Sequence, residues 1–156
     1  MFAHLLALHS LLRWFIVFTL VASVFRAFQG WLSHKNYVKF DRYLNVLVLV
    51  FLYAQLGLGL ILYYKSAYVD YFLNNFKKAI HMRDFRFFGM EHITAMCISI
   101  ILITMGYMKM NQKKTDQGKF KTLAFWFTFG LVILWISIPW SFSPFTSRPD
   151  LRPFSI

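Results

Sequence analysis

The sequence contains one cysteine, no internal repeat, and only six acidic residues against 17 basic ones. The lone Cys97 excludes an intrachain disulfide and leaves the redox compartment open. The net charge of +11 suits anionic lipid headgroups and gives no reason to invoke nucleic acid. No Lys or Arg precedes the first apolar run, and no small-residue cleavage signature follows it. We therefore expect no removed secretory peptide and a first helix that stays in the mature protein.

Apolar residues dominate what is present. They make up 58% of the chain, aromatic residues make up 21%, and the mean hydropathy is +0.52, more than a soluble domain with a polar shell allows. Each of four apolar runs is long enough, at about 1.5 Å per residue, to cross a hydrocarbon core of about 30 Å. A spanning segment must satisfy its own backbone. We therefore predict an all-α integral membrane four-helix bundle in a single domain, 1–156, with helices at about 5–31, 43–64, 88–108 and 123–140.

The segments between and after these runs are polar or irregular. Apolar side chains recur every four residues at Tyr68, Phe72, Phe76 and Ile80, which predicts an amphipathic interfacial segment, a helix in the headgroup plane, between the second and third spans. The basic stretch 109–121 is predicted to be a flexible linker. Three prolines in 141–156 indicate an irregular tail, because proline cannot continue a helical hydrogen-bond ladder.

The basic residues indicate an orientation. Lys and Arg crowd the two short loops that join the first span to the second and the third to the fourth. The positive-inside bias is strongest in short loops beside helix ends. We therefore expect these loops in the cytoplasm and both termini on the periplasmic side of a bacterial inner membrane.

Few polar side chains interrupt the apolar runs, and these are the candidate site residues. His9 and Arg13 are four residues apart and share one face of the first helix. We expect that face to look into the bundle, since an arginine near hydrocarbon must reach the interface or find a partner. Gln55 and Gly59 share a face of the second helix, which favours an interhelical hydrogen bond beside a glycine that lets a helix or a flat ligand approach.

A carboxylate and an imidazole, Glu91 and His92, open the third run, where both are costly to desolvate and therefore indicate a site. His9 and His92 each lie about one turn inside helices that run in the same direction, roughly 6 Å below the same interface. Two imidazoles at matched depth can ligate a haem iron from opposite sides. The alternative from spacing alone is two histidines bonded to interfacial carbonyls or to Glu91.

Glu91 has several interpretations. With two histidines it is similar to a 2-His-1-carboxylate iron site, but adjacent helical residues point about 100° apart and do not easily converge on one ion. Pairing with Arg86 or Arg13 would offset the cost of a charge near hydrocarbon. Glu91 is also able to exchange a proton with a quinol oxygen if an apolar pocket raises its pKa.

Two further ligand choices stay open. Met90 and Met96 lie near His92 and allow copper, although methionines at helical spacing more often pack. His4, close to the chain end, is the substitute ligand if His9 faces lipid.

Four short stretches carry a resemblance: LHSLLRW at 8–14, QLGLGL at 55–60, RFFGMEH at 86–92 and IPW at 138–140. Together the chain resembles small bacterial four-helix membrane proteins of the cytochrome b-like type. The resemblance implies a haem b ligated by His9 and His92, with Arg13, Gln55 and Glu91 in the surrounding shell. Di-haem membrane cytochromes carry histidine pairs toward both faces, and no second intramembrane pair exists here. At most one haem is therefore expected, with electron exchange at one membrane surface.

The sequence leads to two main hypotheses. The first is a single-haem b-type cytochrome that passes electrons between quinol and a partner redox protein. The second is a cofactor-free accessory or assembly subunit of a larger membrane or respiratory complex, because the aromatic fourth helix carries no ionisable residue and offers a docking surface. A proton or ion pathway is weaker, because the ionisable residues cluster near one end of the spans.

Overall fold

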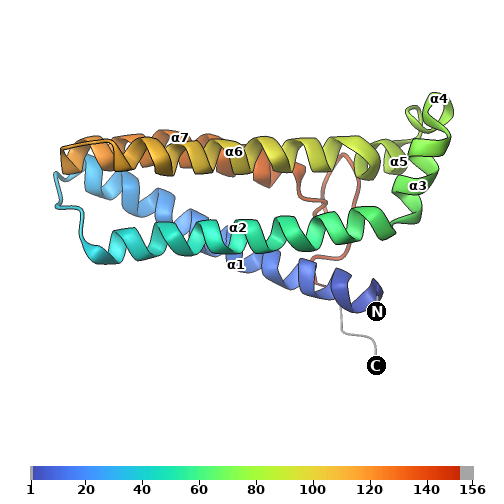
Figure 1. Cartoon of the computed structure of the whole chain (residues 1–156), viewed down its shortest axis with the longest axis horizontal. Helices are drawn as coiled ribbons and strands as arrows, with labels where there is room; N and C mark the ends of the chain where they lie inside the picture. The colour runs from blue at the N-terminus through green and yellow to red at the C-terminus, as the bar shows by residue number, and fades with distance from the viewer. Residues whose placement is uncertain (1, 152–156) are drawn as a thin grey trace.

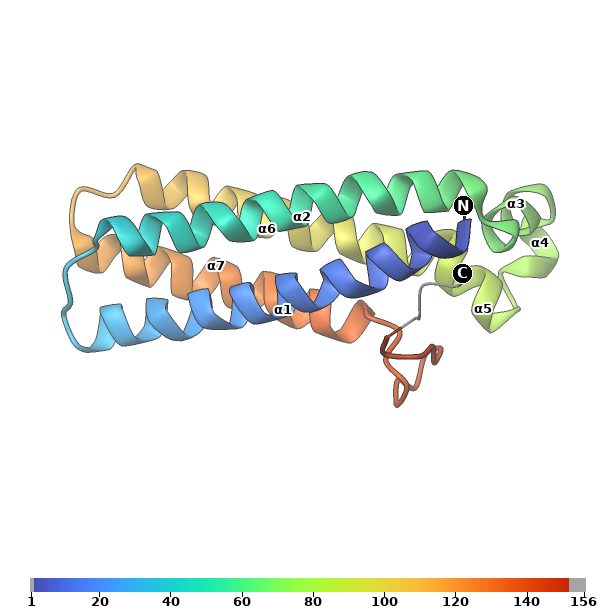
Figure 2. The same ribbon diagram turned by 90° about the horizontal axis from the view of Figure 1, so that it is seen from below.

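The computed structural model describes residues 2–151, which contain helices and no strand. Four long helices lie side by side in both views (Figure 1, Figure 2). They are α1 (Phe2–Leu32), α2 (Lys39–Lys65), α6 (His92–Asn111) and α7 (Asp116–Ser137). Short elements connect α2 to α6 at one end: α3 (Ala67–Asn74), α4 (Phe76–Ala79), α5 (Arg83–Arg86) and the π-helical turn η1 (Phe87–Glu91).

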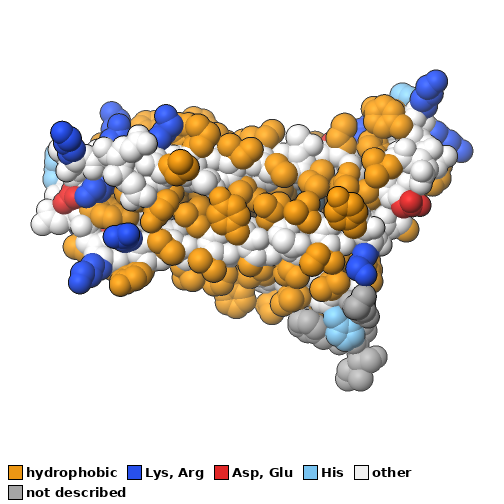
Figure 3. All heavy atoms as spheres, in the orientation of Figure 1, with side chains coloured by type: hydrophobic (Ala, Val, Ile, Leu, Met, Phe, Trp, Pro, Cys, Tyr) orange, Lys and Arg blue, Asp and Glu red, His pale blue; other side chains and the backbone are white. Residues whose placement is uncertain are grey.

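Four helical stretches are long and apolar enough to cross a membrane: 2–32, 39–65, 83–111 and 116–137. The predicted all-α fold and the four membrane-length helices are confirmed in this respect. On the face seen in Figure 3, hydrophobic side chains cover the middle of the long helices, and Lys and Arg gather at the two ends. This distribution suits an apolar band between two headgroup layers.

The long helices do not pack evenly. Helix α1 packs against both α2 and α7, and α6 packs closely against α7, whereas α2 and α6 touch only sparsely. The face of α1 predicted to look inward is buried, including Arg13, Ile16 and Leu20. On α6, Ser99 is fully buried and donates to the carbonyl of Gly130 at 2.7 Å. The cross-section is therefore tight around α1, α7 and α6 and loose between α2 and α6.

The predicted linker 109–121 and the predicted start of the fourth helix were wrong. Helix α6 continues to Asn111 and α7 begins at Asp116. Thr115 caps α7, because its hydroxyl accepts the N–H of Gly118 at 3.1 Å and so satisfies one orphan donor of the first turn. At the other end α7 stops at Ser137, since Ile138 is extended ahead of Pro139.

The segment 66–86 forms three short helices instead of the predicted continuous one. Asn75 leaves the helical region at φ −130° and ψ 39°, and both its main-chain N–H and its side-chain amide donate to the carbonyl of Tyr71. Such local side-chain bonds compete with helix continuation. Val69 and Phe72 are buried, so part of the segment packs onto the bundle. Its position in the headgroup plane stays a prediction.

Candidate functional site

A cavity of about 200 Å³ lies at the end of the bundle that carries the start of α1, the end of α2 and the elements α3 to η1. Its lining comes from α1, α2, α3, η1, α6, the end of α7 and the tail that follows α7. Four of the five candidate residues from the sequence line it, namely His9, Arg13, Gln55 and His92. Most of the remaining lining is apolar, so this end of the bundle holds a few polar groups in a hydrophobic chamber.

His92 is held in one tautomer. Its Nδ1 lies 2.8 Å from the main-chain carbonyl oxygen of Ser137 at the end of α7. Because a carbonyl oxygen can only accept, Nδ1 carries the proton and Nε2 keeps its lone pair. The ring of Phe87 packs beside the imidazole at a centroid distance of 5.6 Å. His92 is thus oriented from behind, in the way that outer-shell carbonyls orient metal-binding histidines.

His9 lies against Gly59 of α2. A Cβ atom at Gly59 would sit 3.4 Å from Cε1 of the His9 imidazole, which is ordinary van der Waals contact. Nδ1 of His9 is buried and has no hydrogen-bond partner among the described residues. His92 and Arg13 line the same cavity as His9. The two imidazoles, which the chain separates by 83 positions, therefore face one chamber.

Gln55 ties α2 to α1. Its Nε2 donates to the main-chain carbonyl of His9 at 3.0 Å. The interhelical hydrogen bond expected beside Gly59 is therefore present. The other end of the amide, Oε1, is buried and has no partner among the described residues. Gln55 thus places an acceptor atom without a donor on the cavity wall.

Arg13 finds its partner in the tail. Its Nη2 donates to the main-chain carbonyl of Asp150, and the Nε1 of Trp14 donates to the same oxygen at 3.1 Å. The guanidinium carbon also lies 5.2 Å from the ring centroid of Trp140, within cation–π range. Arg13 and Trp14 thereby hold the tail against α1. This contact could not be predicted from the residue types, because every residue carries a main-chain carbonyl.

Glu91 lies outside the cavity lining. It pairs with Arg86, whose Nε is 2.6 Å from Oε1, and both side chains are more than a third exposed. Of the two partners considered from sequence, the structure has Arg86 and not Arg13. A pair this exposed stabilises the fold little. The role of Glu91 in a haem shell stays a prediction.

The π-helical turn η1 sets the direction in which His92 points. π-turns are rare and often mark functional sites, because one extra residue rotates everything that follows relative to the preceding helix. The hydroxyl of Tyr63 on α2 donates to the carbonyl of Gly89 within this turn at 2.8 Å. The turn is therefore fixed from across the bundle.

Metal sites of three or more ligands are absent from the described residues: no three His, Cys, Asp or Glu side chains converge. Met96 lines the cavity beside His92, whereas Met90 does not and is 38% exposed. His4 is exposed on α1 and lies outside the lining. Of the two histidines weighed on the first helix, it is therefore His9 that faces the chamber.

The tail that follows α7 forms part of the wall of the chamber. Arg148 and Pro149 belong to the lining. Arg148 Nη2 pairs with Asp84 Oδ2 at 3.0 Å, and the buried hydroxyl of Thr146 donates to Asp84 Oδ1 at 2.8 Å. The carboxylate of Asp84 in α5 thus binds two residues of the tail.

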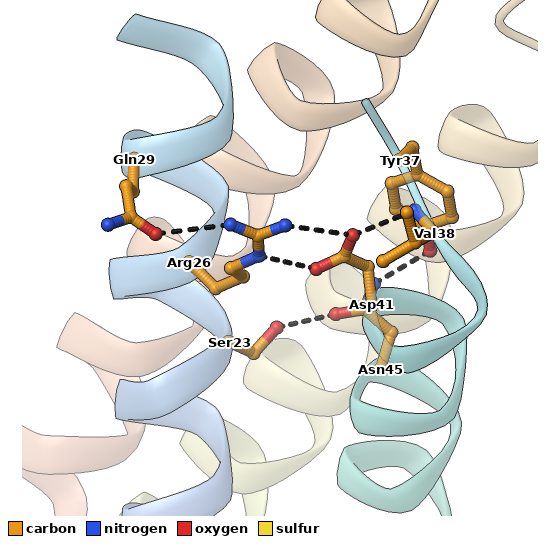
Figure 4. A network of polar contacts seen from close by, with 7 residues as sticks. All are labelled: Ser23, Arg26, Gln29, Tyr37, Val38, Asp41 and Asn45. Carbon is orange, nitrogen blue, oxygen red and sulfur yellow. Dashed lines mark hydrogen bonds and ion pairs between the residues drawn. The ribbon is translucent and has the colours of Figure 1, made fainter. Parts of the chain in front are cut away.

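A second polar cluster, which sequence reasoning missed, joins α1 to the start of α2 at the opposite end (Figure 4). The carboxylate of Asp41, 2% exposed, accepts from Nε and Nη2 of Arg26 at 2.6 and 3.3 Å and from the N–H of Val38. Beneath it, Ser23 donates to Asn45 at 2.5 Å. The one feature of the sequence that could have indicated this cluster is Asp41, an acidic residue in the first turn of α2.

This cluster includes Tyr37 in the loop between α1 and α2. Asn45 Nδ2 donates to the Tyr37 hydroxyl at 3.0 Å. Burial raises the pKa of the Tyr37 phenol, and the bond to Asn45 opposes that rise. The cluster offers no adjoining space for a ligand and is best described as a clamp between two helices.

The site and the fold define an all-helical protein with four membrane-length helices and a chamber that holds two imidazoles at one end. No protein-family model, curated protein or solved structure matches the chain. Function is accordingly inferred from the chamber itself.

Proposed function

We propose that the protein is a single-haem b-type cytochrome of a bacterial inner membrane, with His9 and His92 as axial ligands. The observation that carries the proposal is the pair of imidazoles lining one apolar cavity, one of them with its Nδ1 proton committed to Ser137. That commitment leaves Nε2 as a ready nitrogen ligand and makes it more basic.

The residues fit a haem in their donor set. His9 adds a second imidazole whose buried Nδ1 has no protein partner among the described residues, and Gly59 leaves the space in which this ring lies. Arg13 and Arg148 give the lining two cations, and no acidic side chain is among the lining residues. Such a wall suits the carboxylates of a haem.

The size of the chamber sets a condition on binding. Its volume of about 200 Å³ lies below the roughly 300–1,000 Å³ of typical ligand pockets. Because α2 and α6 contact each other sparsely, we expect the chamber to widen by a movement of these two helices away from each other.

Each part of the chain has a separate task in this proposal. A bound haem would supply reversible one-electron chemistry. The apolar walls exclude water, the Ser137 carbonyl orients His92, and Arg13 offsets negative charge while it holds the tail closed. Glu91 is paired with Arg86 outside the cavity lining, so it lacks the apolar pocket that proton exchange with a quinol would need, and this proposal assigns it no step. Electrons would pass between quinol and a redox partner on the periplasmic side, where both termini are proposed to lie.

The optical spectrum tests the proposal most directly. Protein purified in detergent after expression with ample haem should show a Soret band, with sharpened α and β bands after dithionite reduction. His92→Ala and His9→Ala should each lose six-coordinate spectra, whereas the exposed His4 on the same helix serves as the matched control in His4→Ala. A wild-type protein without a Soret band, or a His4→Ala loss equal to that of His92→Ala, overturns the proposal.

The second candidate is a cofactor-free accessory subunit of a larger membrane complex. The observation that favours it is the low burial of α2, whose most apolar window is 17% buried against 28–33% in the other three helices. A face this open is covered by lipid or by another membrane protein. A stoichiometric membrane partner that co-purifies without any chromophore would favour this candidate over the first.

A further inference from the structure

The chamber extends deeper than the two histidines. Along α1 its lining runs from Phe2 to Ile16, fourteen positions or about 21 Å of helix. Below the level of His9 the walls are Ile16, Leu52 and Ile100, all nearly inaccessible to solvent. Ser10 and Arg13 also line this part of the chamber, and both donate to the carbonyl of Asp150. The amide of Gln55 differs from them because its oxygen is buried and has no hydrogen-bond partner among the described residues.

The Gln55 amide is oriented by its bond to α1. Because the carbonyl of His9 accepts a hydrogen bond, the amide end that faces it must be the NH₂ group. The other end of the amide is therefore Oε1, which is buried and has no hydrogen-bond partner among the described residues. A buried carbonyl without a donor is unfavourable. An occupant that relieves it must bring an O–H or N–H group, because a carbonyl oxygen cannot donate.

The lipid side offers a way in. Two hydrogen bonds bridge α2 to the α6 side: the Tyr53 hydroxyl to Thr104 at 2.9 Å and the Tyr63 hydroxyl to the carbonyl of Gly89 at 2.8 Å. Tyr53 and Tyr63 are ten residues apart, about 15 Å along α2. Over their whole length α2 and α6 touch sparsely, and between the two tyrosines Leu60 is both 41% exposed and part of the lining. The two bridges thus frame an apolar window.

The end of the chamber at the tail is more closed than the side between α2 and α6. The tail crosses it, fixed by Arg13 to the carbonyl of Asp150 and by Asp84 to Thr146 and Arg148. A molecule dissolved in the bilayer reaches the chamber through the window without breaking these bonds.

We propose that the deep part of the chamber binds a membrane-dissolved lipophile with a hydroxyl head group, which enters between α2 and α6 and donates its hydroxyl to Oε1 of Gln55. A lipophilic hydroquinone and a long-chain isoprenoid alcohol share this chemistry. The choice of a hydroquinone rests on the proposed function, whereas the binding of a hydroxyl group at Gln55 does not.

The test compares three probes on detergent-purified, haem-free protein by equilibrium dialysis: decylhydroquinone, its dimethyl ether with the same ring and chain, and farnesol. Wild type should bind the hydroquinone about five- to tenfold more tightly than the ether, the value of one hydrogen bond to a buried acceptor. Gln55→Leu should bind both about equally. Gln117→Leu is the matched control, because Gln117 makes the same kind of interhelical bond, Nε2 to the Trp31 carbonyl at 2.7 Å, away from the chamber.

Each outcome is decisive. Equal binding of hydroquinone and ether to wild type, or a preference that survives in Gln55→Leu, overturns the proposal. Farnesol binding as tightly as the hydroquinone keeps the hydroxyl site and assigns it to an alcohol. For the route, Leu60→Trp should slow association at the window and Arg148→Ala should not; the reverse pattern overturns lateral entry.

Protein from the same preparation, measured with and without added haem, separates this inference from the proposed function. A haem spectrum without any preference for the hydroxyl probe overturns the hydroxyl site alone. A preference for the hydroxyl probe in protein that never takes up haem overturns the cytochrome proposal alone.

Discussion

Replacing Gly59 by leucine would drive a branched side chain into the imidazole of His9. The Cβ atom alone would lie 3.4 Å from Cε1 of that ring, so Gly59→Ala meets an ordinary contact and should keep the site. Leucine adds three carbon atoms beyond a Cβ that already touches the ring, so the imidazole has to move. Overpacking of this kind costs about 1–3 kcal/mol. If the ring is a ligand, haem binding weakens by roughly 5- to 150-fold.

Gly57 provides the control, since a Cβ at that position has nothing within 4 Å. Gly57→Leu makes the same chemical change on the same helix, two residues away, and should leave binding unaltered. Haem titration followed at the Soret band measures the dissociation constants, and far-UV circular dichroism checks that each variant is folded. Equal affinity in Gly59→Leu and Gly57→Leu would refute ligation by His9.

Three other predictions concern stability and the tail. Asp41→Leu removes the carboxylate that lies 2.6 Å from the guanidinium of Arg26. It should lower the free energy of unfolding in detergent by about 3 kcal/mol, and the double variant with Arg26→Met should recover most of that loss. An unchanged free energy of unfolding in Asp41→Leu would contradict this. Ser99→Ala removes a fully buried hydrogen bond to α7 and should lower the free energy of unfolding by about 1 kcal/mol. An unchanged free energy of unfolding would contradict this. The main-chain N–H of Ser141, followed by its hydroxyl, lowers the pKa of Asp150. Because the folded-state pKa is the lower one, this stabilisation is present above about pH 4 and is lost as the pH falls further. Amide exchange in 141–151 should therefore accelerate only in that acidic range, and acceleration already at neutral pH would contradict it.

Hydropathy alone identified the helices well and their ends poorly. A run of about 20 apolar residues can satisfy its backbone only as a helix, so the four long elements could be predicted. Their limits depend on single local contacts, such as the hydroxyl of Thr115 on the N–H of Gly118, that hydropathy does not record. The break at Asn75 has the same origin.

The candidate residues divide in the same way. His9, Arg13, Gln55 and His92 were identified from the sequence because a polar side chain in an apolar run stands out, and all four line the chamber. Glu91 stood out equally but points to Arg86. The residue types do not record the π-turn that precedes His92, and only the coordinates show which of two adjacent polar residues faces inward.

What the sequence determined by itself is the number of membrane-length helices and the presence of two imidazoles near the same end, because hydrophobic length and residue spacing are properties of the chain. Tertiary structure decided that α2 and α6 stand apart, that the tail lies over Arg13, and that a carbonyl of α7 fixes the tautomer of His92. These features depend on main-chain atoms and on gaps between helices, which arise only when segments far apart in the chain pack together.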